Sequence, residues 1–254
     1  MLGDFPEPDV TESSRRLLTG RVALVTGGTR GLGRHIASAL LTAGARVAIT
    51  GRSVERAHET ASDLLALHPD GECAGFGCDQ TDPKAIAGLP VAVRQAIGDP
   101  DLVVNNAAAF TGNDVLKMTL DQWTHTIQTN LTGVFLMTKA FLPAMIARRR
   151  GDLFMIGSMS GKKGDPGSSA YAASKFGLRG FAEALLHEVR RTNVRVVVLN
   201  PSSIDTSADD GAHAGPGLHL HAADIGSTIV HLAMLPGRTL IREMDIWGTN
   251  PFTG

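Results

Sequence analysis

The chain has 254 residues, of which 43% are hydrophobic and 19% charged, and this composition excludes a disordered or fibrous protein. The 24 basic and 25 acidic residues nearly cancel, which argues against a protein that binds nucleic acid by neutralising phosphates. Two cysteines, Cys73 and Cys78, cannot form a disulfide framework. The first 20 residues contain no apolar signal segment, and the apolar runs are short. We therefore expect a cytoplasmic protein that does not contact a membrane.

Residues 1–19 are polar and aperiodic, so we interpret them as an N-terminal extension to a single domain, residues 20–254. From Arg21 onward, short β-branched runs alternate with longer helical segments. We expect a strand that ends near Cys78 and six further strands, at Val22–Thr26, Arg46–Thr50, Asp101–Asn105, Leu153–Gly157, Val194–Leu199 and Leu240–Trp247.

We expect helices at Leu32–Ala43, from a Ser53 cap to Leu67, from Thr81–Pro83 onward, and at Leu120–Arg149, Ala170–Arg191 and Ala223–Met234. Residues 202–221 are rich in Gly, Ser, Asp and His, and we interpret them as a flexible loop. Repeated strand–helix units with apolar strands predict an α/β fold: a Rossmann-type, doubly wound parallel sheet of seven strands with helices on both faces.

The first strand runs into the glycine-rich segment Thr26–Gly33, which reads T-G-G-T-R-G-L-G and opens a helix. Glycines let such a turn approach a pyrophosphate, which then lies at the helix N-terminus. The segment alone is also compatible with an ordinary strand-to-helix turn, but its place after the first strand favours a dinucleotide site.

The residues after the second strand indicate which dinucleotide binds. An NAD site usually has an acidic residue there, whereas this chain has Gly51-Arg52-Ser53. Arg52 and Arg30 are available to bind a 2′-phosphate, which favours NADP(H). The alternative is that both are solvated surface arginines.

Tyr171 and Lys175 are four residues apart at the start of a predicted helix, so they share one helical face. A nearby ammonium lowers the pKa of a phenol from about 10 towards a catalytic range. On its own such a pair is usually an exposed helix pair. However, Ser158 and the Asn105–Ala108 segment follow strands that end at the same sheet edge. Asn130 falls within the long predicted helix, where it either serves the site or satisfies a backbone carbonyl at a kink.

Taken together, T-G-x-x-x-G-x-G, N-N-A-A, the helical Asn130, Ser158 and Y-x-x-x-K make residues 20–248 resemble the short-chain dehydrogenase/reductase family, and among its members the 3-oxoacyl thioester reductases. The resemblance implies that Tyr171 is the general acid and that Ser158 holds the substrate oxygen. It also implies that Lys175 lowers the pKa of Tyr171 and binds the nicotinamide ribose, and that Asn130 binds a water of a proton relay to Lys175.

The resemblance further implies a set of cofactor contacts: the glycine turn for the pyrophosphate, Asp79 for adenine, Asn106 and Ala107 for the adenosine side, and Ile204 with Thr206 for the nicotinamide amide. The full expected set is Gly27, Thr29, Arg30, Gly31, Leu32, Gly33, Arg52, Ser53, Asp79, Gln80, Asn106, Ala107, Ala108, Tyr171, Lys175, Pro201, Ser202, Ile204 and Thr206. Two positions depart from the family pattern: Ala108 replaces the glycine of N-N-A-G, and Ser202 replaces the glycine after Pro201.

We therefore expect an NADP-dependent oxidoreductase (EC 1.1.1.-) that acts on a small carbonyl or alcohol substrate, with Phe110, Met159 and the 202–221 loop near a moderately hydrophobic substrate. By analogy with the family we expect a homo-oligomer, a dimer or a tetramer. The alternatives are a non-catalytic NADP-binding regulatory protein and a lyase or epimerase on the same scaffold. His213, His219 and His221 cluster in the loop, but a zinc site needs a further ligand in a fixed geometry, so we expect no metal.

Overall fold

The computed structural model describes residues 17–205 and 220–248. The strands of its main sheet are β1 Val22–Val25, β2 Arg46–Gly51, β3 Cys73–Gly77, β4 Leu102–Asn105, β5 Gly151–Ile156, β6 Val194–Pro201 and β9 Glu243–Ile246. They lie in the order β3-β2-β1-β4-β5-β6-β9, and every neighbouring pair is parallel. The predicted seven-stranded, doubly wound sheet is confirmed.

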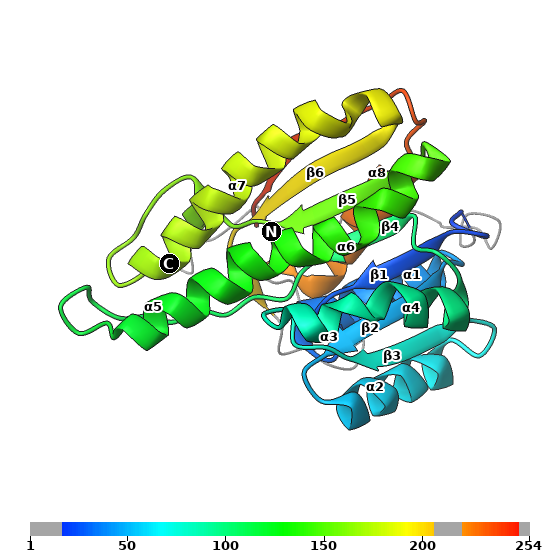
Figure 1. Ribbon diagram of the computed structural model, residues 1–254, viewed down its shortest axis with the longest axis horizontal. Helices are drawn as coiled ribbons and strands as arrows, with labels where there is room; N and C mark the ends of the chain where they lie inside the picture. Colours follow the sequence, from blue (N-terminus) through cyan, green and yellow to red (C-terminus); the bar gives the residue numbers. More distant parts are fainter. Residues whose placement is uncertain (1–16, 206–219, 249–254) are drawn as a thin grey trace, which may run out of the picture.

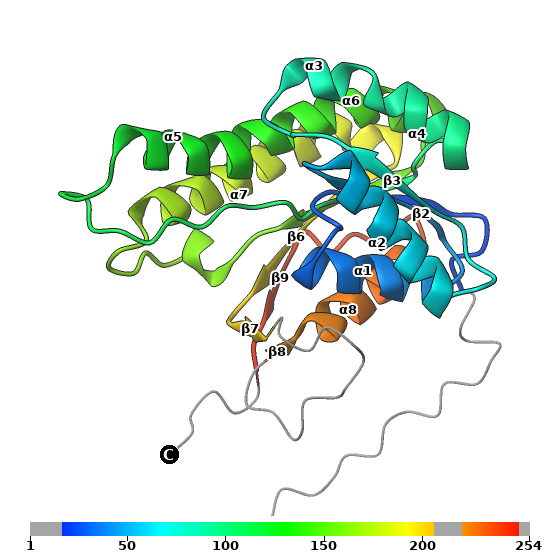
Figure 2. The ribbon, with the colours of Figure 1, turned by 90° about the horizontal axis from the view of Figure 1, so that it is seen from below.

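Helices cover both faces of this sheet (Figures 1 and 2). On one face lie α1 (Gly31–Thr42), α2 (Val54–Leu67) and α8 (Ala222–Met234), and on the other lie α3 (Pro83–Ala87), α4 (Leu89–Ile97), α6 (Gly133–Arg148) and α7 (Ser169–Val189). Each face has its own apolar core, because strands buried on both sides carry apolar residues at nearly every position. Helix α5 (Leu120–Ile127) and the start of α7 extend past the sheet (Figure 2).

Local signals place several helix ends where the sequence predicts them. The Ser53 hydroxyl caps α2 by accepting from the Arg56 N–H. Asp82 caps α3, and Pro83 occupies its first turn. Gly88 then separates α3 from α4, so the single helix expected after Thr81 is two short ones.

The long helix expected over 120–149 contains an irregularity that the sequence does not reveal. Five residues, Gln128–Thr132, form a π-helical turn (η2) between α5 and α6. Arg149 has a left-handed φ of 51°, which ends α6, and β5 begins at Gly151, two residues earlier than predicted. The π-helical turn carries Asn130 and turns its side chain inward.

Three further boundaries differ from the expected ones. The last strand is only Glu243–Ile246, shorter than 240–247. The ends of the expected 202–221 loop pair as short parallel strands, β7 (Ile204–Asp205) and β8 (Leu220–His221). Leu18, in the expected N-terminal extension, is buried in the core and its N–H donates to the Ala43 carbonyl.

The stretch Leu120–Arg148 has the length and composition of a membrane-spanning helix. In this fold its α6 part lies on the sheet, with Phe141 and Met145 buried in the core. Packing against the sheet therefore accounts for the apolar residues of α6 that are buried.

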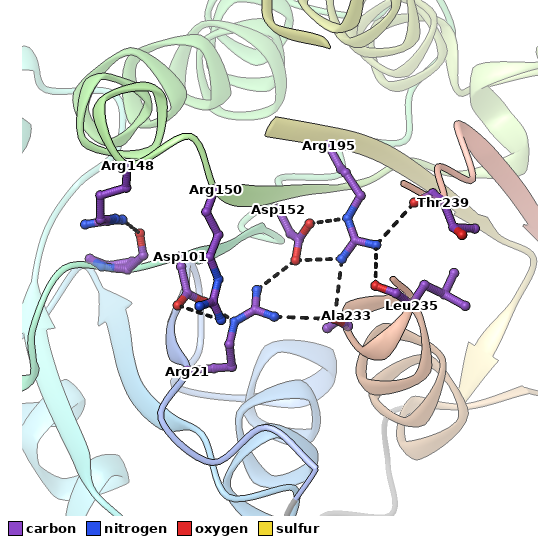
Figure 3. A network of polar contacts seen from close by, with 10 residues as sticks. Arg21, Asp101, Arg148, Arg150, Asp152, Arg195, Ala233, Leu235 and Thr239 are labelled. Atoms are coloured by element: carbon purple, nitrogen blue, oxygen red, sulfur yellow. Dashed lines mark hydrogen bonds and ion pairs between the residues drawn. The ribbon is translucent and has the colours of Figure 1, made fainter. Parts of the chain in front are cut away.

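A buried ion network ties the amino ends of four strands together (Figure 3). Arg21 bonds both Asp101 and Asp152, and Arg195 forms a two-bond fork with Asp152 at 2.5 and 2.9 Å. Arg195 also donates to the Leu235 and Thr239 carbonyls beyond α8. Such a network is costly to break, because loss of one partner leaves a buried charge uncompensated. It lies at the edge of the sheet opposite to the carboxyl ends of the strands.

Candidate active site

The turn between β1 and α1 lies at the carboxyl edge of the sheet, where the strand order reverses between β1 and β4. Gly27 has a φ of +63°, and a Cβ there would lie 2.9 Å from the Ala107 Cα, in the segment after β4. A Cβ at Gly33 would clash with the Gly27 carbonyl oxygen. Glycine is therefore required at both positions for the turn to fold this tightly.

Side chains from β1 and from the segment after β4 fix this turn. The Thr26 hydroxyl accepts the N–H groups of Asn106 and Ala107, both at 3.0 Å. The Asn106 amide donates to the carbonyls of Thr26 (2.9 Å) and Gly27 (3.3 Å). The Asn106 amide therefore holds the backbone of the glycine turn, and its expected contact with the cofactor stays a prediction.

Within the described residues, the N-cap residue of α1, Arg30, makes no side-chain capping hydrogen bond, whereas Ser53 and Thr119 cap α2 and α5. The first N–H groups of α1 and the positive end of its dipole thus remain available to an anion. Together with the close-packed glycines, these amides fit the pyrophosphate of a dinucleotide.

A groove of about 420 Å³ continues from this turn along α2. It is lined by Thr29, Arg30, Arg34, Ser53, Glu55, Arg56, Glu59, Thr60 and Asp63. Arg34 and Arg56 were not expected there, although both lie one turn along a helix from expected residues, Arg30 and Ser53. The groove therefore presents three guanidinium groups near the start of α1 and α2, together with the carboxylates of Glu55, Glu59 and Asp63, and Asp63 pairs with Arg34 at 3.9 Å.

Three other expected cofactor residues, Arg52, Asp79 and Gln80, follow the ends of β2 and β3. Arg52 is exposed, and its charge helps to lower the pKa of Asp79, after the larger effect of the Thr81 N–H that bonds the same carboxylate. Gln80 is buried instead, and its amide donates to the carbonyls of Ala107 (3.1 Å) and Thr129 (2.8 Å). Its amide thus braces the interior, and its expected contact with the cofactor stays a prediction.

The expected reacting residues come together beside this turn. Ser158 follows β5 and caps a short 3-10 turn, η3 (Met159–Gly161), where the Ser160 N–H donates to its hydroxyl at 3.1 Å. Ser158 lies close enough to Tyr171 of α7 to lower the pKa of the phenol as a hydrogen-bond partner. Lys175, one turn further along α7, lies with its Nζ 5.5 Å from the centre of the Tyr171 ring.

Burial shifts the pKa values of both α7 residues. It raises the pKa of Tyr171, with the Ser158 hydrogen bond acting in the opposite direction. It lowers the pKa of Lys175 to about 8, while the ammonium donates to the Ile156 carbonyl at 2.7 Å. The expected lowering of the Tyr171 pKa is not found in this structure, because Lys175 donates to the backbone and desolvation of the phenol dominates.

Asn130 acts as a clamp. Its Oδ1 accepts the Ala109 N–H at 2.7 Å, and its amide donates to the Ala109 carbonyl (2.8 Å) and the Ser174 hydroxyl (3.0 Å). Ser174 in turn donates to the Tyr171 carbonyl at 2.7 Å. Both amide donors are thus occupied, and the side chain joins the β4–α5 loop to the helix that carries Tyr171.

Apolar side chains lie next to the reacting groups. The Phe110 ring meets the Tyr171 ring edge-on, with centroids 5.2 Å apart, and Phe110 is 67% exposed. Met159 is half-buried directly after Ser158. Exposed aromatic surface beside a reacting phenol suits an apolar ligand group.

The remaining expected residues lie along the same edge or outside the described part. Pro201 is buried at the end of β6, and the Ser202 N–H donates to the Ile246 carbonyl at 2.8 Å. Ile204 is half-buried in β7, and Ala108 is exposed. Thr206, His213 and His219 lie outside the described residues. Within 17–205 and 220–248, no group of three or more His, Cys, Asp or Glu side chains could hold a metal ion.

Comparison with known proteins places this geometry in context. The family model described as short chain dehydrogenase matches residues 21–215. The 3-oxoacyl-[acyl-carrier-protein] reductases FabG of Salmonella typhimurium and Escherichia coli are each 38% identical over 187 residues, which is 74% of this chain and 75% of each relative.

Solved structures agree with this likeness. A metagenomic short-chain oxidoreductase in complex with NADP has a TM-score of 0.79 at 33% identity, covering 94% of this chain and 100% of that one. An alcohol dehydrogenase from the archaeon Thermococcus sibiricus, complexed with 5-hydroxy-NADP, has a TM-score of 0.82, covering 92% of this chain and 99% of that one. At 24% identity, the second likeness concerns the fold alone.

Proposed function

Because the chain belongs to the short-chain dehydrogenase family, we propose that it transfers hydride between NADP(H) and a small carbonyl or alcohol compound. The observation that carries this proposal is that Ser158 and Tyr171 lie close together, with Lys175 one turn away, at the sheet edge that also carries the glycine turn at the switch point. The proposed compartment is the cytoplasm, and the proposed assembly is a homodimer or homotetramer.

The residues around the glycine turn fit the cofactor. The first amides of α1 would hold the pyrophosphate, and Asp79 would contact the adenine. Arg30 of the groove and Arg52 nearby would bind the 2′-phosphate; Arg56 lines the same groove, whereas Arg34 pairs with Asp63. A similar protein of known structure is in complex with NADP, which supports the same choice. When bound, the nicotinamide supplies or accepts the hydride.

The chain's own residues would supply the proton and hold the carbonyl oxygen. Tyr171 donates its proton to that oxygen, and Ser158 donates a hydrogen bond to the same atom as negative charge develops on it. The raised pKa of Tyr171 keeps the phenol protonated at neutral pH, which suits carbonyl reduction. Lys175, charged below its pKa of about 8, would bind the nicotinamide ribose.

The substrate class follows from the surroundings of this pair. Phe110 and Met159 present apolar surface to the reacting groups, which favours a moderately hydrophobic ketone or aldehyde. The 38% identical relatives are 3-oxoacyl-[acyl-carrier-protein] reductases, so 3-oxoacyl thioesters are the first compounds to assay.

The test is a screen of carbonyl compounds in which the absorbance of NADPH is followed. Net consumption of NADPH, reduced by a factor of about 10² to 10⁴ in Tyr171→Phe, is the expected result. Lys163→Met is the matched control, because its exposed ammonium lies outside the site and its loss leaves the rate unchanged. Turnover without net consumption would favour a lyase or epimerase, and cofactor binding without any turnover would favour a regulatory protein.

A further inference from the structure

Helix α7 carries a third polar side chain on the face that holds the reacting pair. Tyr171, Lys175 and Arg179 are spaced four residues apart, so they lie in one row along the helix. Lys175 donates to the Ile156 carbonyl at 2.7 Å, and Tyr171 lies close to Ser158. Arg179 Nη1 donates to the Gly161 carbonyl at 2.9 Å. These three side chains therefore contact the segment 156–161, which carries Ser158, at three points.

The Gly161 end of this segment lies directly on α7. A Cβ at Gly161 would stand 3.0 Å from the Lys175 carbonyl oxygen and 3.2 Å from the Arg179 Cδ. The turn Met159–Gly161 has only three residues, and a 3-10 turn of that length is weakly stable by itself. Its geometry nevertheless sets the Ser158 hydroxyl, which accepts the Ser160 N–H. Contacts from outside the turn must therefore hold it.

Arg179 is itself held by a carboxylate on the edge strand β9. Its Nε and Nη2 form a fork with the two Glu243 oxygens, at 2.8 and 3.2 Å. Glu243 also bonds the Asn200 amide at 2.6 Å and pairs with Lys162 at 3.0 Å. Lys162 comes directly after the turn and reaches Asp245 at 2.6 Å. The C-terminal end of the turn is thus tied both to α7 and to β9.

We propose that Arg179 and Glu243 are a positioning pair for the reduction: they hold the turn Met159–Gly161 so that the Ser158 hydroxyl points towards Tyr171 and the substrate oxygen. This inference rests on the proposed function. Arg179 bonds the turn rather than the reacting atoms, so it acts through Ser158. Two hydrogen bonds to Glu243 fix the Arg179 guanidinium, and its Nη1 donates to the Gly161 carbonyl.

A neighbouring ion pair provides a matched control. Arg242, just before β9, pairs with Glu183 of α7 at 3.3 Å, and both side chains are about 60% exposed. This pair joins the same helix to the same edge of the sheet but does not touch the turn. If tethering α7 to the edge strand were all that mattered, Arg242→Met and Arg179→Met would have similar effects.

The first readout is the ultraviolet titration of the single tyrosine in the chain. Because the Ser158 hydrogen bond lowers the pKa of Tyr171, misplacing that serine raises the titration midpoint. Arg179→Met and Glu243→Gln are expected to raise it, as Ser158→Ala does, and Arg242→Met leaves it unchanged. In a Ser158→Ala background, Arg179→Met is expected to cause no further shift.

The second readout is steady-state reduction. For Arg179→Met we expect kcat to fall about 10- to 100-fold with the KM for NADPH within twofold of wild type, since a small displacement of a catalytic group is costly. Arg179→Lys keeps one donor and is expected to recover part of the rate and of the fold if the methionine variant is poorly folded.

An unchanged Tyr171 midpoint in Arg179→Met, or an equal shift in Arg242→Met, would overturn the positioning role. A further shift of similar size in the Ser158→Ala background would overturn it as well. The titration needs no substrate, so it decides this inference even if the wild-type protein reduces no carbonyl compound, a result that would count against the proposed function alone.

Discussion

The buried ammonium of Lys175 leads to a prediction about stability as well as activity. Lys175 is 3% exposed, and burial lowers its pKa from 10.5 to about 8. The folded protein therefore binds this proton less tightly than the unfolded chain does. At neutral pH the charged side chain destabilises the fold, so we expect Lys175→Met to be the more stable protein although it loses most of its activity.

The size of the effect follows from linkage. The shift from 10.5 to about 8 corresponds to roughly 3 kcal/mol of unfolding free energy, fully present below pH 8. The methionine leaves the Ile156 carbonyl without its donor, which costs about 1 to 3 kcal/mol. The net gain at pH 7 is thus about 1 kcal/mol. As pH rises from 8 towards 10.5, folded Lys175 loses its proton first, wild-type stability recovers, and the advantage of the variant falls.

The assay is urea unfolding followed by tryptophan fluorescence at about pH 7 and pH 9.5, at equal protein concentrations. Both proteins carry Tyr171→Phe, so that phenol ionisation does not contribute. The free-energy difference between Lys175→Met and its parent is expected to fall by roughly 2 kcal/mol between the two pH values. Lys163→Met, at a side chain that is 82% exposed, is the control and should show no such trend.

A difference between Lys175→Met and its parent that stays constant across this pH range would refute the reasoning. It would mean that the buried amine is solvated well enough to keep its ordinary pKa, and that its hydrogen bond to Ile156 alone accounts for its effect on stability.

Two further predictions concern charged groups outside the reacting pair. Arg30→Ala and Arg52→Ala should each weaken NADPH binding at least about tenfold more than NADH binding in calorimetric titrations, because each removes a donor to the 2′-phosphate; equal losses would mean that the phosphate lies elsewhere. Arg179 lowers the pKa of Glu243 from 4.5 to about 2, so its carboxylate stabilises the fold above pH 4.5 and this contribution is lost as pH falls towards 2. Thermal unfolding of Glu243→Gln should show a smaller decline over that range, and an identical decline would contradict the assignment.

Patterns among neighbouring residues are sufficient to predict much of the candidate site. The apolar run Val22–Val25 followed by closely spaced glycines predicts the β1–α1 turn, because few other residues adopt its backbone conformation. Ser53 predicts the start of α2, because its hydroxyl accepts the N–H of Arg56, only three residues further along the chain. The spacing of Tyr171 and Lys175 sets them on one helical face whatever packs against it. Each of these features depends on atoms that are neighbours along the chain.

Other features depend on partners that are distant in sequence. The residues Q-T-N-L-T of Gln128–Thr132 do not by themselves indicate a π-helical turn, so the sequence does not reveal it. The clamp from Asn130 to Ser174 spans 44 residues, and the fork between Arg179 and Glu243 spans 64. A sequence shows that an amide or a guanidinium is present, but the partner that satisfies it is chosen by how the helices and strands pack.

Tyr171 and Lys175 show most clearly what the sequence determines and what the fold determines. The four-residue spacing already placed the phenol and the ammonium side by side, as helical geometry requires. The direction in which their pKa values move was decided by the fold, because burial removes water from both groups and brings Ser158 and the Ile156 carbonyl to them. Local covalent geometry determines which way a side chain points, whereas its solvation and its partners arise only when distant segments pack together.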